Sequence, residues 1–177
     1  MVTETDDHST LEVGLIGTES MLGLSLILGV NVSPLRALVQ GAGTALRMKA
    51  IDFQRELAVN APLDRDLRRH LYLLLAELAQ ASVCTRFHLV EARLARWLLM
   101  TQDCAHADHF HLKHEFLAEM LGVRRSGITI AAGSLQRKRL IRYKRGNITV
   151  IDREGLEHAS CACYGVVAAT YKRLLFT

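Results

Sequence analysis

The sequence predicts an α+β protein, and three observations support that class. The N-terminal third is spotted with glycine and reads as short strands. A stretch without glycine or proline follows from Leu63 to Leu121, which permits long helices. A helix, a glycine turn, a second helix and a hairpin then follow one another in the pattern of a winged helix-turn-helix. With 50% hydrophobic and 23% charged residues, the chain is neither disordered nor fibrous.

The N-terminal segment mixes strand and helix signals. Residues 11–17 and 35–48 read as short strands separated by glycine turns. Residues 19–29 fit either a short helix or a strand. Residues 50–60 predict a short helix, with Asp52 near its N-terminus.

A long helix is predicted over 62–83 because apolar side chains there recur seven residues apart. Two such series run side by side, which is typical of a dimer seam with two heptad positions. An ordinary amphipathic core helix remains the alternative. The predicted dimer interface consists of Leu67, Leu71, Leu74, Leu78 and Ala81.

The next segment predicts a shorter helix followed by a connection. Residues 91–100 show apolar residues at helical spacing, and we interpret Trp97 among them as a core anchor. Residues 102–113 are polar and read as a linker.

The helix-turn-helix is the most specific pattern in the chain. An amphipathic helix over 114–121 ends at Gly122, and a second helix begins near Arg124 or Arg125 and continues to about Lys138. Its predicted buried face consists of Ile128, Ala131, Ala132 and Leu135.

A wing and a closing helix complete the pattern. Residues 140–143 and 148–151 predict a hairpin with a basic turn between them. Asp152 reads as the N-cap of one closing helix that carries Leu156, Ala159 and Cys163 along one face.

Positive charge is concentrated in this region. The chain has a net charge of +4, but residues 122–146 hold eight basic side chains and no acidic one. Such a face suits DNA, whose phosphates attract Lys and Arg, although a solvated basic surface is the alternative. Donors at the start of the second helix would read bases, namely Arg124, Arg125, Ser126 and Thr129. Phosphate contacts are expected from Lys113, His114, Arg137, Lys138, Lys144 and Arg145.

Residues 91–164 resemble the C-terminal half of the Crp/Fnr family of bacterial transcription regulators. The motifs that carry the resemblance are RLARWLL (93–99), FLAEMLGVRRSGIT (116–129), LQRKRLIRY (135–143) and IDREGLEHASCACY (151–164). The resemblance implies a homodimer on a palindromic operator, with double-stranded DNA and RNA polymerase as candidate partners. It places Arg125 where the family reads guanine, but Ser126 and Ile130 stand where many members have Glu and Arg.

Residues 12–57 look like the tail of the family's sensor domain, a cyclic-nucleotide-binding-like β-roll. The expected organisation is therefore a truncated sensor remnant (1–61), a dimerisation and connecting helix (62–100) and a winged helix-turn-helix domain (101–177). The expected acidic-Gly and Arg-Ser pairs of a cyclic-nucleotide site do not match here. We therefore expect no cyclic nucleotide to bind, and the effector is left unknown.

Other functional classes find less support in the sequence. Cys104 and the histidines between 106 and 114 lie in a linker, and Cys161 and Cys163 are expected to point to different faces of one helix. We therefore predict no metal site, no cofactor and no catalytic residues. The N-terminus lacks a secretory signal, and no run of apolar residues is long enough to span a membrane, so we expect a cytoplasmic protein. An interaction protein that pairs with full-length relatives and a small-ligand sensor are the alternative functions.

Overall fold

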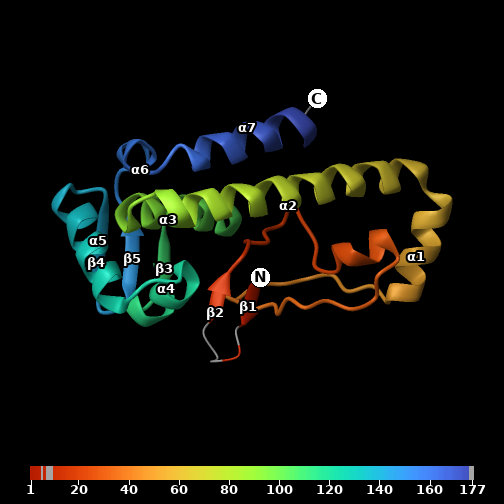
Figure 1. Cartoon of the computed structure of the whole chain (residues 1–177), viewed down its shortest axis with the longest axis horizontal. Helices are drawn as coiled ribbons and strands as arrows, with labels where there is room; N and C mark the ends of the chain where they lie inside the picture. The colour runs from red at the N-terminus through yellow and green to blue at the C-terminus, as the bar shows by residue number, and fades with distance from the viewer. Residues whose placement is uncertain (5, 7–9, 176–177) are drawn as a thin grey trace.

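A computed structural model describes residues 1–4, 6 and 10–175. The long helix α2 (Ala61–Phe87) forms the spine of the molecule, and α7 (Cys163–Leu175) lies along it (Figure 1). The predicted helix over 62–83 is confirmed and continues four residues further. Asn60 caps its start, because the Asn60 side chain accepts a hydrogen bond from the Leu63 amide at 3.1 Å.

The winged helix-turn-helix lies at the C-terminal end of α2. It combines α3 (Val90–Ala105), α4 (His114–Leu121) and α5 (Arg125–Arg137) with a three-stranded antiparallel sheet of order β3-β5-β4. The strands are β3 (His109–His111), β4 (Ile141–Lys144) and β5 (Asn147–Val150). The predicted linker over 102–113 is therefore wrong: α3 continues through its first residues, and β3 pairs with β5 in its second half.

One hydrophobic core joins all of these elements. Its fully buried side chains include Leu94 and Leu98 of α3 and Leu117 of α4. The predicted buried face of α5 is confirmed, and Trp97 is buried in the same core as expected. Because α3 supplies so much of this core, the predicted boundary at residue 100 falls inside one packed unit.

Local chemistry explains the two turns of the motif. The predicted bounds of α4 are confirmed, and Gly122 ends the helix in the left-handed conformation with φ of 61°. A side chain at Gly122 would also meet the Leu11 Cδ1 atom at 2.8 Å. In the wing, Arg145 and Gly146 both have positive φ, which is typical of a tight hairpin turn.

The C-terminal end contains two helices where one was predicted. The Asp152 cap is confirmed, since its carboxylate accepts a hydrogen bond from the Gly155 amide at 2.9 Å. However, α6 (Arg153–Ala159) ends at Ser160, and α7 begins at Cys163 in a new direction (Figure 1). The break turns α7 back along α2, where the Tyr171 ring meets the His70 ring edge-on.

The N-terminal segment has little regular structure. It contains a small hairpin of β1 (Val2–Glu4) and β2 (Thr10–Glu12), a 3-10 helix η1 (Leu24–Leu28) and α1 (Ala50–Val59). The prediction of α1 is confirmed, and η1 resolves the ambiguity over 19–29 as helix. The predicted strands over 11–17 and 35–48 are mostly absent, because the strand pairing of these described residues is limited to 11–12 and one bridge at Arg36.

This segment packs against both other parts of the molecule. Val2 is buried in the winged-helix core, and the Trp97 indole donates a hydrogen bond to the Glu12 carboxylate at 2.8 Å. Burial raises the pKa of Glu12. Farther along α2, Leu24, Ile27 and Phe53 form a small separate cluster. Among the described residues, no helix is both long enough and apolar enough to cross a membrane.

Candidate nucleic-acid interface

The exposed face of α5 carries the residues that were predicted to read bases. Ile128 and Leu135 anchor the opposite face of the helix in the core. This anchoring leaves Ser126 and Thr129 exposed on one side, with Arg124 and Arg125 at the N-terminal end. The structure therefore brings the four predicted base-reading residues together on the exposed side of α5, at its N-terminal end.

Arg125 contacts a residue of the preceding helix. Its guanidinium forms an ion pair with the Glu115 carboxylate of α4, with 2.8 Å between Nε and Oε1. Both side chains are more than half exposed, so this pair is weak and can exchange for another acceptor. Glu115 thus orients the guanidinium without burying it.

Thr129 and His114 connect the two helices of the motif. The Thr129 hydroxyl lies 3.2 Å from the Arg125 carbonyl and 3.0 Å from His114 Nδ1, so it can hydrogen-bond with both helices. The His114 ring stacks on Tyr143 of the wing, with ring centroids 4.2 Å apart. Burial, with the nearby Arg125 charge, lowers the pKa of His114, which favours a neutral ring.

Several predicted phosphate-contacting residues meet at the wing. The Leu112 amide donates a hydrogen bond to the Gly146 carbonyl at 2.6 Å, which ties the start of α4 to the wing tip. A side chain at Gly146 would lie 3.6 Å from the Lys113 Cγ atom. Lys113, Lys144 and Arg145 are therefore exposed cations at one edge of the domain.

The two basic residues at the end of α5 differ in their contacts. Arg137 is exposed to solvent. Lys138 instead forms an ion pair with Glu91 of α3, with 2.6 Å between Nζ and Oε1, and this contact lowers the pKa of Glu91. Lys138 thus has a structural partner that the sequence did not indicate.

Arg142 is an exposed cation that the predicted site left out. The strand registers place it beside Thr149 and His109 in one row, and Lys144 beside Asn147 and His111 in the next. Arg142 and Lys144 therefore share the exposed face of β4. The alternation of exposed and buried residues in a strand was a signal that could have identified Arg142.

The predicted dimer seam is partly covered within the chain itself. Leu67, Leu71 and Leu74 pack against the cluster formed by η1 and α1, and Leu78 and Ala81 are half-buried. Exposed apolar side chains occur about a third of a turn around α2 from this seam. They are Tyr72, Leu75, Ala79 and Val83.

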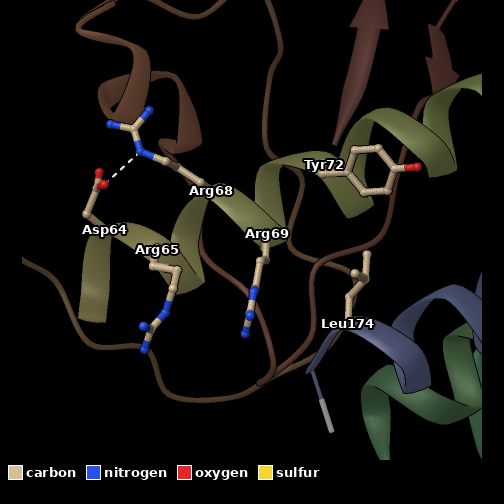
Figure 2. Close-up of a pocket in the computed structure, with 6 residues that line it drawn as sticks. All are labelled: Asp64, Arg65, Arg68, Arg69, Tyr72 and Leu174. Atoms are coloured by element: carbon tan, nitrogen blue, oxygen red, sulfur yellow. Dashed lines mark hydrogen bonds and ion pairs between the residues drawn. The ribbon is translucent and has the colours of Figure 1, made fainter. Parts of the chain in front are cut away.

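A shallow groove lies where the start of α2 meets the end of α7 (Figure 2). Arg65, Arg68 and Arg69 line it together with Tyr72 and Leu174. Asp64 accepts a hydrogen bond from Arg68 at 2.7 Å. The other two arginines, Arg65 and Arg69, lie 3.8 and 3.7 Å from the Asp66 carboxylate. Because its arginines already have acidic partners on α2, the groove is a weaker candidate than the α5 face.

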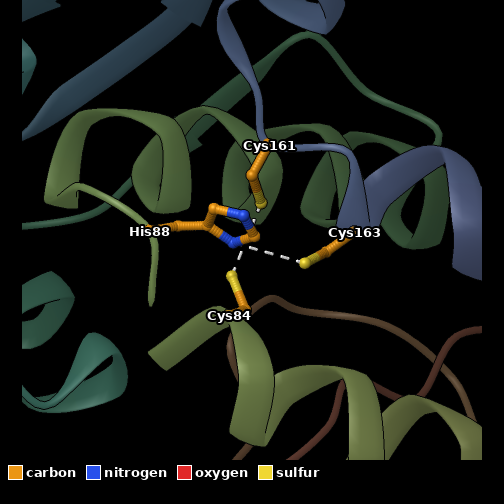
Figure 3. Close-up of side chains that lie close together, drawn as sticks. All are labelled: Cys84, His88, Cys161 and Cys163. Carbon is orange, nitrogen blue, oxygen red and sulfur yellow. Dashed lines mark hydrogen bonds between the residues drawn. The ribbon is translucent and has the colours of Figure 1, made fainter. Parts of the chain in front are cut away.

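Three of the four cysteines gather around a histidine, away from the α5 face (Figure 3). Cys84 and His88 lie at the C-terminal end of α2, Cys161 lies between α6 and α7, and Cys163 is the first residue of α7. The expectation that Cys161 and Cys163 point to different faces of one helix is wrong, because the helix is broken at this place. A hydrogen bond from Cys84 lowers the pKa of the Cys161 thiol.

Comparison with known proteins agrees with this geometry. Residues 92–159 match the model of the Crp-like helix-turn-helix domain. A transcriptional regulator of the CRP/FNR family from Thermus thermophilus is similar in structure, with a TM-score of 0.61, 20% identity and coverage of 90% of this chain and 81% of that one. FixK2 from Bradyrhizobium japonicum is similar with a TM-score of 0.57, 16% identity and coverage of 65% and 60%.

A third solved structure, a Crp/Fnr-family regulator from Eubacterium rectale, has a TM-score of 0.48 and 22% identity, and it aligns with 62% of this chain. This chain covers 51% of the Eubacterium rectale protein and 60% of FixK2, so it spans between half and two thirds of the length of these two relatives. No curated protein is significantly similar in sequence. The matched residues and the shared fold together identify residues 92–159 as a Crp-like helix-turn-helix domain on a chain with the Crp/Fnr regulator fold.

Proposed function

We propose that this protein is a sequence-specific transcription regulator of the Crp/Fnr type. It inserts the N-terminal half of α5 into the major groove of double-stranded DNA and binds a palindromic operator as a homodimer. The observation that carries the proposal is the exposed start of α5, where Arg124, Arg125, Ser126 and Thr129 project from one end of a firmly packed helix. A regulator of this kind acts in the cytoplasm, beside the DNA.

The charge distribution supports the same orientation on DNA. Lys113 precedes α4 and lies beside the wing tip, and Arg137 is the last residue of α5, at the end opposite Arg125. Cations on both sides of a groove-reading helix would contact the two phosphate backbones, while the helix itself contacts base edges. Arg125 is the strongest base-reading candidate, because an arginine fork matches the two acceptors of guanine.

The homodimer would form through the exposed stripe of α2 formed by Tyr72, Leu75, Ala79 and Val83. The predicted seam is already half covered by the chain's own η1 and α1, so a partner helix meets the neighbouring stripe first. The apolar positions of this stripe recur at spacings of three and four, which suits helix-on-helix packing. The relative direction of the two paired α2 helices would set the spacing between operator half-sites.

Base reading is tested with the operator selected by the protein from random duplex DNA. Arg125→Ala should lower the affinity for that operator by about 5- to 150-fold, while the affinity for unrelated DNA changes much less. Arg55→Ala, which removes an exposed arginine of α1, is the matched control and should bind normally. An equal loss on both DNAs would show that Arg125 contacts only phosphate.

The interface is tested by sedimentation of full-length variants. Leu75→Asp should shift the protein from dimer to monomer, because it places a charge in the middle of the exposed stripe. Ile51→Asp, at an exposed apolar position of α1 outside the stripe, is the control for a charge that stays in solvent. A Leu75→Asp protein that remains dimeric would refute this interface, and a wild-type monomer would refute the homodimer.

A further inference from the structure

The cluster of Cys84, His88, Cys161 and Cys163 plays no part in the proposed DNA contact. Cys84 and His88 are four residues apart, so their side chains lie on one face at the end of α2. Cys161 and Cys163 approach from the segment between α6 and α7, and Figure 3 shows the His88 ring directed toward the three sulfur atoms. Cys84, Cys161 and Cys163 are buried, and His88 is half-buried.

Two distances within this cluster lie close to the edges of a tetrahedron around one metal ion, and the remaining ligand atoms are near enough to close around it after small side-chain shifts. All four ligand atoms lie within 4.8 Å of one another. Cys84 Sγ and Cys161 Sγ are 3.5 Å apart, and Cys163 Sγ and His88 Nδ1 are 3.4 Å apart. A tetrahedral zinc ion with ordinary Zn–S and Zn–N bonds separates two sulfurs by about 3.8 Å and a sulfur from a nitrogen by about 3.5 Å.

Neighbouring groups complement a bound ion. Gln80 donates a side-chain hydrogen bond to Cys163 Sγ at 3.0 Å, as an outer partner of a thiolate ligand does. Arg93 and Arg96 lie close enough to interact electrostatically with the thiols. Three thiolates and one imidazole around Zn²⁺ carry a net charge of −1, which these buried arginines would offset.

Two other chemistries fit the geometry less well. A disulfide between Cys84 and Cys161 would not account for the positions of Cys163 and His88, whose side chains point into the same centre. A four-iron cluster binds each cysteine to a different iron, which requires the sulfurs to lie farther apart than they do here. A single thiophilic ion accounts for all four side chains.

We propose that Cys84, His88, Cys161 and Cys163 bind one zinc ion in a closed tetrahedral site. Because all four positions are filled by protein, the site is structural. Zinc binds the three cysteines as thiolates, so whichever of them are still protonated release their protons to solvent when the ion is taken up. The proposal concerns the metal alone and does not rest on the proposed DNA binding.

The site lies where three parts of the chain meet: α2, the winged helix-turn-helix and α7. His88 stands at the junction between α2 and α3, where one helix ends at Phe87 and the next begins at Val90. Cys161 and Cys163 belong to the segment that turns α7 back along α2. One ion would therefore fasten the winged helix-turn-helix to the long helix at their junction and hold α7 in place.

The experiment measures metal on the full chain purified under reducing conditions. Wild type should contain about one zinc per chain, and exchange for Co²⁺ should produce the visible absorption of tetrahedral cobalt with a thiolate charge-transfer band. Chelation should lower the melting temperature, and added zinc should restore it. Cys104→Ser is the matched control, because Cys104 lies outside the cluster, and it should retain one zinc and the same spectrum.

The variants decide which chemistry is correct. Cys161→Ser and Cys163→Ser should lose the zinc, and His88→Asn should lose it or change the cobalt spectrum. The chelation result on wild type keeps the test valid if a cysteine variant fails to fold. Wild type without zinc that takes up no Co²⁺ would overturn the proposal, as would equal zinc in Cys163→Ser and wild type. A Cys84–Cys161 disulfide that persists through purification under reducing conditions, seen as a mass lower by two hydrogens, would also overturn it.

Discussion

The winged helix-turn-helix and the N-terminal segment are stabilised in different ways. In the first, α3, α4, α5 and the sheet enclose one large core that leaves Leu94, Ile128 and Leu135 without solvent exposure. In the second, only Leu24, Ile27 and Phe53 are buried together among the described residues, and they rest on α2 rather than on a sheet of their own. The first region has a closed core, whereas the second depends on surfaces provided by the rest of the chain.

The two regions also differ in how firmly they hold their side chains. A helix that reads bases must hold its side chains in a fixed orientation, and a closed core provides that. The N-terminal segment contributes through isolated contacts, such as the Glu12–Trp97 hydrogen bond and the buried Val2. Substitutions in the two regions should therefore differ in size.

The largest expected effect comes from a core cavity in the winged helix-turn-helix. Leu135→Ala should lower the free energy of unfolding by about 3 kcal/mol, because its fully enclosed site cannot collapse around the smaller side chain. Leu24→Ala should cost less, about 2 kcal/mol, since the small cluster can relax around the smaller side chain. Urea unfolding followed by circular dichroism measures both. Equal losses would remove the contrast between the regions.

A buried carboxyl group between the regions predicts a pH dependence. Burial raises the pKa of Glu77 to about 7, with Arg96 opposing this and Glu12 and Glu19 reinforcing it. The unfolded state releases the Glu77 proton from about pH 4.5, whereas the folded state keeps it until about pH 7. The contribution of Glu77 to the free energy of unfolding is therefore full below pH 4.5 and is lost as pH rises through 7. The loss should be on the order of 3 kcal/mol, because one pKa unit corresponds to about 1.4 kcal/mol.

Glu77→Gln isolates this contribution. The amide imitates the protonated carboxyl, so the variant should keep its melting temperature between about pH 5 and 8, where that of the wild type falls. Glu56→Gln, on an exposed position of α1, should leave the wild-type slope intact. If the Glu77→Gln slope equals that of wild type, the carboxyl group does not titrate in this range.

Gly122 offers a sharper comparison, because it lies where the two regions touch. Gly122→Ala should cost about 1–2 kcal/mol, since its φ of 61° disfavours a side chain and Leu11 would have to move. The double variant Gly122→Ala with Leu11→Ala should recover part of the loss in thermal unfolding. No recovery would mean that the backbone conformation alone sets the cost.

The smallest expected effect separates two lysines of the basic surface. Lys144→Ala should weaken DNA binding at every sequence and reduce its salt dependence by about one ion. Lys138→Ala should change DNA binding less, because Lys138 pairs with Glu91, and should alter stability by less than about 1 kcal/mol. Titrations at several salt concentrations measure both, and the reverse order would show that Lys138 leaves Glu91 on DNA.

Patterns within a few residues were predicted well. The helix over 114–121, the glycine at 122, the buried face of α5 and the Asp152 cap all follow from spacing and turn chemistry. Strands predicted from composition alone, as over 35–48, were not formed, because a strand needs a partner edge that the local sequence does not specify. The strand β3 was missed for the converse reason, since its pairing with β5 stabilises a polar stretch.

Long-range placement accounts for the rest. Lys138 meets Glu91, and Cys84 meets Cys161, across 47 and 77 positions of the chain. Neither spacing resembles a recognised motif, so the sequence could not indicate the contacts. The expectation that Cys161 and Cys163 point to different faces of one helix was wrong because the helix breaks at Ser160, so the two residues do not lie on one continuous helix.

By itself the sequence determined the α+β class, the helix-turn-helix with its wing, and the concentration of positive charge on it. These depend on hydrophobic periodicity, capping residues and side-chain charge, all of which act between near neighbours. The tertiary structure alone decided that η1 and α1 cover part of the long helix, and that three cysteines and His88 share one centre. Both outcomes depend on how the helices turn and pack, because packing brings together side chains that the sequence keeps far apart.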